Sequence, residues 1–193
     1  DGIVWGYNKR MPDQPLSFFD IYLLNSAGDL HDLIGWYTDP GQPQVQQVRF
    51  EHGQQPWDPV IGTGISCSAF VKPVGSKQGY YEDLIFGHNT WSNFFSMNRI
   101  FKQYTLRFKD PFVKAYMVAF SSRPAFVCSK DDYYVTSAGI ASQETTNSVA
   151  DRSLYEKLTP ESVLCFMRSA IANRLADNGD VWTKVFAIAN SGT

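Results

Sequence analysis

The stretch GTGISCSAF, residues 62–70, places a cysteine between two serines at the head of an apolar run. A cysteine outside a disulfide most often behaves as a small buried hydrophobe. Two features favour a nucleophilic role for Cys67 instead. It stands where a long polar segment meets an expected strand, and the small residues Gly62, Gly64 and Ser66 before it allow unusual backbone angles. The sequence thus leaves two interpretations of Cys67, a core thiol and a reactive one.

The second interpretation implies a specific mechanism. If the peptide bond between Ser66 and Cys67 is strained, the thiol attacks the preceding carbonyl, and hydrolysis of the resulting thioester makes Cys67 a new N-terminus. Its α-amine, with a pKa of about 8, then serves as general base for its own thiol. One residue supplies both nucleophile and base, and the cleavage site is the Ser66–Cys67 bond.

A second cluster, GHNTW at 87–91, contains His88, Asn89 and Trp91 at the end of an expected strand. A histidine before a helix is commonly just a hydrogen-bonded residue near the cap. If the strand that ends near His88 pairs with the strand that begins at Cys67, the histidine instead orients the thiol or a substrate carbonyl. Asn89 and backbone N–H groups are candidate donors to the oxyanion of the tetrahedral intermediate.

A third polar cluster, SQETTNS at 142–148, follows a strand-like run. A turn is its default interpretation; alternatively, a hydroxyl of Thr145 or Thr146 faces the site. The neighbouring carboxylates Asp131 and Asp132 are interpreted as a turn, because adjacent side chains on a strand point to opposite faces and do not form an acid–base pair.

The spacing of apolar residues predicts the strands and helices that carry these side chains. We expect a hairpin of strands 67–74 and 80–90, further strand-like runs in 114–122, 125–129 and 131–142, and helices at 28–37, 90–104 and 159–179. Thr159 is the expected cap of the last helix and Asn178-Gly179 its end. This order predicts an α+β domain with a largely antiparallel sheet. The Pro-, Gly- and Gln-rich residues 38–66 predict a linker, so the chain divides into an upstream segment, 1–66, and a catalytic part, 67–193.

Composition limits the function classes. The 193 residues carry a formal charge of −2, and 44% are apolar, enough for a sizeable core. Lys and Arg are scattered, which argues against nucleic acid as a partner. No apolar stretch approaches the roughly 18–20 residues of a transmembrane segment. The histidines and cysteines lack metal-ligand spacing, so we expect neither a metal nor a cofactor.

Seven segments in a consistent order resemble the phospholipase B-like family, which includes the lamina ancestor proteins. They cover most of the chain from about residue 20: AGDLHDL, CSAFVK, DLIFGHNTW, NRIFKQY, FSSRPAF, DDYYVTSAGIASQETTN and NRLADNGDVWTKVFAIANSGT.

The resemblance implies an N-terminal nucleophile hydrolase fold, an αββα sandwich in which helix layers enclose two antiparallel sheets. It implies autocatalytic cleavage before Cys67. It matches His88 and Trp91 to the family's histidine and tryptophan near the nucleophile, and Thr146 to the second threonine of the family's Glu-Thr-Thr motif. The implied activity is deacylation of glycerophospholipids or of related amides, in a lysosomal or secreted protein. Family members are much longer, and an asparagine and an arginine of their site fall outside this sequence. The fold is therefore expected to be incomplete in this chain, with the remaining polypeptide of the same protein as a partner.

Two other functions stay open. The aromatic content of 15% and the missing site residues are compatible with a non-catalytic lipid-binding or structural module of the same fold. A conventional thiol hydrolase that pairs Cys67 with His88 would need no cleavage.

Overall fold

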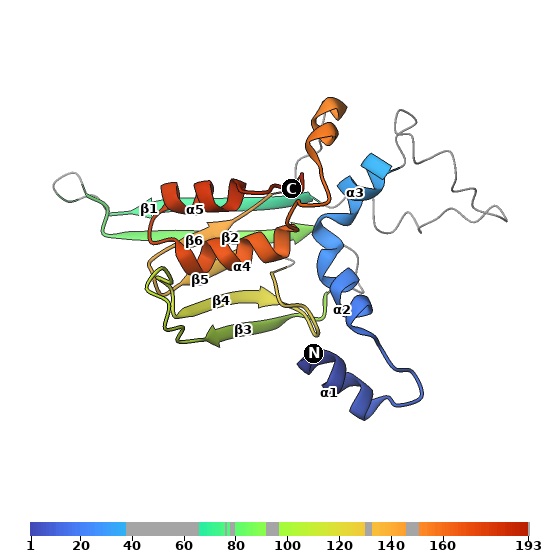
Figure 1. Cartoon of the computed structure of the whole chain (residues 1–193). Helices are drawn as coiled ribbons and strands as arrows, with labels where there is room; N and C mark the ends of the chain where they lie inside the picture. Colours follow the sequence, from blue (N-terminus) through green and yellow to red (C-terminus); the bar gives the residue numbers. More distant parts are fainter. Residues whose placement is uncertain are drawn as a thin grey trace.

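The computed structural model shows a layered α+β arrangement, with the strands stacked beside helices α4 and α5 and the N-terminal helices at one end (Figure 1). The residues that the structure describes are 1–37, 66–75, 77, 80–91, 97–129, 133–145 and 151–192. The predicted linker up to residue 65, the predicted turn at Asp131 and Asp132, and Thr146 lie outside them.

The predicted hairpin is present. Strands β1 (Ser66–Val74) and β2 (Asp83–Trp91) pair antiparallel, with Cys67 opposite Thr90 and Ala69 opposite His88. Because side chains alternate along a strand, this register places Cys67, Thr90 and His88 on one face of the hairpin.

A second sheet carries the core. Its strands β3 (Ile100–Thr105), β4 (Met117–Ser122), β5 (Tyr133–Thr136) and β6 (Ala141–Gln143) are all antiparallel, in the order β3-β4-β5-β6. The ring of Phe86 on β2 stacks on Tyr133 with 5.4 Å between centroids, so the hairpin covers one face of this sheet. The other face bears the core residues Val118, Phe120 and Tyr134. The α+β class with antiparallel sheets is confirmed.

Helices α4 (Cys165–Leu175) and α5 (Gly179–Ala187) cover that core face. Ser142 Oγ on β6 donates a hydrogen bond of 3.3 Å to Asn173 Oδ1 on α4, which ties the two layers together. The prediction of one helix from 159 to 179 was wrong at both ends. Leu164 is the N-cap of α4, and Asn178 accepts a bond of 2.9 Å from Val181 N as the cap of α5. Asn178 therefore starts a helix, a role for which asparagine is well suited.

Two other element predictions were wrong. The predicted helix at 90–104 is contradicted because Thr90 and Trp91 end β2 and 100–105 form β3, which pairs with β4 over six residues. The apolar spacing fitted a helix, but pairing with a neighbouring strand decided the conformation.

The predicted strand at 125–129 is a turn segment, with Ala125 at a φ of 66°. Its backbone is bonded mainly by side chains rather than by a neighbouring strand. Asn25 Nδ2 donates to the Ala125 carbonyl, and Val127 N donates to Asn25 Oδ1.

The N-terminal residues form α1 (Gly2–Arg10), α2 (Phe18–Asn25), a 3-10 turn (Ser26–Gly28) and α3 (Leu30–Tyr37), and the last agrees with the predicted helix at 28–37. Asp29, just before α3, is fully buried. Its carboxylate accepts bonds of 3.0 and 3.1 Å from Cys165 N, at the start of α4, and another from Ser191 Oγ. Arg168 in turn donates to Ser191 Oγ at 3.1 Å. The segment upstream of Cys67 is thus built into the interior of the downstream part.

Alanine at Asp29 is expected to lower the free energy of unfolding by about 2–4 kcal/mol, because α4 loses its cap and buried donors lose their acceptor. Urea denaturation measures this effect. Asp13→Ala, at an exposed site, is the control and should change stability little. A loss below about 0.5 kcal/mol for Asp29→Ala, the range typical of surface substitutions, would show that the buried carboxylate is not needed.

Candidate active site

Cys67 is the second residue of β1 and is half-buried. Thr90 lies directly across from it on β2, and His88 is the diagonal neighbour on the same face. Diagonal neighbours in an antiparallel pair are separated by about 7–8 Å, close enough for two side chains of this size to act on one substrate. The hairpin register therefore brings Cys67 and His88 together.

The imidazole of His88 is held by a backbone group. His88 Nε2 donates a hydrogen bond of 2.5 Å to the carbonyl oxygen of Glu144. A carbonyl only accepts, so Nε2 carries the proton, and in the neutral ring Nδ1 is the acceptor. His88 Nδ1 is buried and has no hydrogen-bond partner among the described residues. The site thus presents a buried, basic nitrogen on the same face of the hairpin as the thiol.

Two of the predicted site residues lie on the other face of the hairpin. Strand alternation places Asn89, opposite Ser68, and Trp91, opposite Ser66, away from Cys67. Trp91 is 53% exposed. For the oxyanion, this geometry favours backbone N–H groups near Cys67 over the side-chain amide of Asn89.

The polar cluster after β6 reaches the site through its backbone. Glu144 bonds to His88, and Thr145 directly after it is half-buried. No sequence pattern pointed to Glu144, because it contributes a main-chain carbonyl, which every residue type has.

A cavity of about 400 Å³ adjoins His88. It is lined by Phe86, Gly87, His88, Asn89, Thr90, Arg99, Ser121 and Tyr133. Asn89 thus borders this cavity, although strand alternation places its side chain on the other face of the hairpin from Cys67. Burial lowers the pKa of the Arg99 guanidinium from its usual value. Arg99 was not among the predicted site residues, because its segment was assigned to a helix with no connection to the hairpin.

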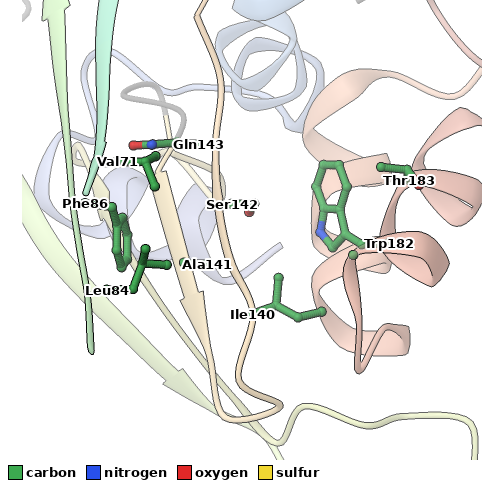
Figure 2. Close-up of a pocket in the computed structure, with 10 residues that line it drawn as sticks. Val71, Leu84, Phe86, Ile140, Ala141, Ser142, Gln143, Trp182 and Thr183 are labelled. Carbon is green, nitrogen blue, oxygen red and sulfur yellow. The ribbon is translucent and has the colours of Figure 1, made fainter. Parts of the chain in front are cut away.

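A second cavity, of about 370 Å³, lies between the hairpin, β6 and α5 (Figure 2). Val71, Leu84 and Phe86 face it from the hairpin, and Trp182 faces it from α5. Phe86 lines both cavities, so the inner face of the hairpin is apolar on one side of this ring and polar on the other.

Across the described ranges, no group of three or more His, Cys, Asp or Glu side chains gathers closely enough to hold a metal ion. None of the helices in the part of the chain that the structure covers is long and apolar enough to cross a bilayer.

Comparison with known proteins decides the family. The sequence model of one family, described as phospholipase B, matches residues 1–193. The chain belongs to the phospholipase B family. It is 35% identical over 207 residues to phospholipase B-like protein G of Dictyostelium discoideum and 33% identical over 196 residues to phospholipase B-like 1 of Rattus norvegicus. It is also 35% identical over 197 residues to phospholipase B of Crotalus adamanteus.

Each of these matches covers 100% of the chain but only 32–34% of the relative. The chain therefore spans about one third of the length of these phospholipase B family members. The family resemblance inferred from the ordered motifs is confirmed, and both sides of the Ser66–Cys67 bond lie within the matched region.

Proposed function

We propose that the protein is a cysteine N-terminal nucleophile hydrolase that is cut between Ser66 and Cys67 and removes acyl chains from glycerophospholipids or related amides. The observation that carries the proposal is the hairpin register, which puts Cys67 at the start of β1 on the same face as His88. Nδ1 of His88 has no hydrogen-bond partner within the described parts of the chain. Membership of the phospholipase B family supports acyl-ester hydrolysis as the reaction class. A lysosomal or secreted location belongs to the same proposal.

The first step is self-cleavage. Cys67 Sγ attacks the carbonyl carbon of Ser66, and the C–N bond breaks with a proton going to the nitrogen. A thioester and a free α-amine result. Water then hydrolyses the thioester, which leaves a carboxylate on Ser66 and the thiol on an N-terminal Cys67.

The second step is turnover. The α-amine takes the thiol proton, Sγ attacks the acyl carbonyl, and the ammonium returns the proton to the leaving alcohol or amine. Water then attacks the acyl-thioester to release the fatty acid and restore the thiol. Backbone N–H groups near Cys67 are the proposed oxyanion donors, with Asn89 retained as a candidate.

His88 is proposed to orient the thiol or the substrate carbonyl. Its bond to the Glu144 carbonyl fixes the ring and its tautomer, so Nδ1 is the atom available to the site. Thr145 and Thr146, which follow Glu144, are proposed to bind substrate, and Trp91 is proposed for the same role on its family match alone.

An acyl probe that reacts with thiols tests the function. Stoichiometric labelling of Cys67, together with release of fatty acid from a lysophospholipid or an acyl amide, is expected. A non-catalytic lipid-binding or structural module would bind lipid without either result. A conventional Cys67–His88 hydrolase would keep its full activity after the α-amine of Cys67 is blocked, whereas the proposed enzyme would lose it.

The proposed partner of this chain is the rest of the same polypeptide, docked at β6. The Ile140 carbonyl accepts a hydrogen bond from Thr136 N, so the backbone groups of Ile140 point toward β5. Because this direction alternates along a strand, the backbone groups of Ser142 also point toward β5, and those of Ala141 and Gln143 point away from it. The apolar cavity flanks this edge. An edge whose outward backbone groups pair with no strand of the described residues, beside apolar walls, is suited to a further strand. The relatives carry two thirds of their length outside the matched region.

Hydrogen exchange on the complete polypeptide tests this docking. The amides of Ala141 and Gln143 are expected to exchange as slowly as the Ser142 amide, because a docked strand would bond Ala141 and Gln143 as β5 bonds Ser142. Ser142 is the internal control. Fast exchange at Ala141 and Gln143 beside slow exchange at Ser142 would show that no strand covers β6.

A further inference from the structure

We infer that Arg99 binds the phosphate of the substrate in the polar cavity beside His88 and is the residue that makes the enzyme prefer phospholipids to neutral acyl esters. This inference rests on the proposed hydrolase function and adds the group that recognises the substrate.

Arg99 lies on the face of the β3–β6 sheet that packs against the hairpin. Arg99 directly precedes β3, and Phe101, two residues later, lies opposite Ser121 on β4. Side chains two apart on an extended segment share a face, so Arg99 lies on the same face as Ser121. This is the face on which Tyr133 stacks against Phe86 of the hairpin. One cavity is therefore lined by Arg99 from the side of the sheet and by His88 from the hairpin.

The charge of this cavity suits an anion. Among the described residues that line it, Arg99 is the one with a permanent charge, and none of them is an aspartate or glutamate. Burial lowers the pKa of Arg99 from its usual value. Guanidinium nevertheless stays protonated in proteins, and its planar fork binds phosphate oxygens in pairs.

The position of the cavity suits a substrate that bears both a phosphate and an ester. Thr90, in the lining, is directly opposite Cys67 across the hairpin. A phosphate bound by Arg99 would therefore lie in a cavity whose wall at Thr90 is directly across the hairpin from Cys67. Since every glycerophospholipid has the phosphate, this contact predicts dependence on the phosphate and tolerance of the group attached beyond it.

Paired substrates test the role of Arg99. The purified protein is assayed with a lysophosphatidylcholine and with a monoacylglycerol of the same acyl chain, both as monomers in solution. Arg99→Gln is expected to lower kcat/KM for the phospholipid by about 10- to 100-fold, mainly through KM, which is the range for a hydrogen bond to a charged group. Monoacylglycerol hydrolysis should stay within about two-fold, the change expected when no charge-assisted bond is lost. Arg99→Lys should restore part of the loss, because the charge remains without the fork.

Arg107→Gln is the matched control. Arg107 is exposed just beyond the other end of β3, where its guanidinium lies 4.9 Å from the Tyr116 ring centroid. It should leave both substrates unaffected. Equal losses on both substrates for Arg99→Gln, or no loss on either, would overturn the inference.

A binding measurement separates failure of the phosphate site from failure of the proposed hydrolase function. If the wild-type protein hydrolyses neither ester, calorimetry with the ether-linked analogues of both lipids separates the two ideas. Tighter binding of the phosphate-bearing ether that Arg99→Gln abolishes would uphold the phosphate site without the enzyme. Equal binding of the two ethers, or binding of neither, would overturn the phosphate site as well.

Discussion

Alanine in place of Cys67 is expected to leave the polypeptide uncut between Ser66 and Cys67 and to lower acyl hydrolysis by at least about 10⁴-fold, as removal of a nucleophile typically does. The reason is that one sulfur atom attacks first the chain and then the substrate. Intact mass measurement and an ester assay read out the two effects separately. Cys128→Ala is the matched control, because Cys128 is a core thiol that is 8% exposed and lies outside the site. It should cut and hydrolyse normally.

A second variant, Cys67→Ser, tests whether the side chain at this position makes the cut. A hydroxyl performs the same attack less readily, so Cys67→Ser should be cut slowly while Cys67→Ala stays whole. If the alanine variant is cut at the same bond, another protease makes the cut. If it hydrolyses esters at the wild-type rate, Cys67 is not the nucleophile.

The second large effect is expected at His88. Alanine there should lower kcat by about 10²- to 10³-fold, the usual loss when a group that positions or stabilises the reacting atoms is removed. Steady-state kinetics on the cleaved protein measures it. Lys72→Ala is the control, because Lys72 is exposed and points from the opposite face of the same hairpin. It should leave kcat within about two-fold, in line with removal of a side chain that makes no transition-state contact.

A purely structural role for His88 makes a different prediction. If the ring serves only to join β2 to the Glu144 carbonyl, His88→Ala would lower Tm while kcat of the folded fraction stays at the wild-type value. That combination would remove His88 from the proposed machinery.

The hairpin could be predicted from sequence because its signals are local. The sequence GSKQG at 75–79 is typical of a turn, and the apolar runs on both sides of it predict two strands that pair with each other. The observed pairing puts Cys67 and His88 on one face. The segment 100–105 failed for the opposite reason. Its apolar residues recur at helical spacing, and only its pairing with β4, more than ten residues away, makes it a strand.

The parts of the site that stayed hidden depend on long-range contacts. Glu144 contributes a main-chain carbonyl 56 residues from His88. Asp29 meets Ser191 across 162 residues, although each looks unremarkable in its own segment. Arg99 lines the cavity because the chain after it forms the strand β3. The wrong prediction of a helix at 90–104 therefore gave no reason to consider Arg99 as a site residue.

The buried position of Asp29 bears on the products of cleavage. Its bonds to Cys165 and Ser191 join the segment before the proposed cut to the part after it. Two pieces produced by cleavage should therefore stay together through purification under native conditions and separate only on denaturation.

N-terminal sequencing of the purified, active protein shows whether the bond between Ser66 and Cys67 is cut. The proposed mechanism predicts a terminus that begins Cys-Ser-Ala-Phe at Cys67, present in the same amount as the upstream piece. A fully active protein whose chain is continuous across Ser66 and Cys67 would contradict it.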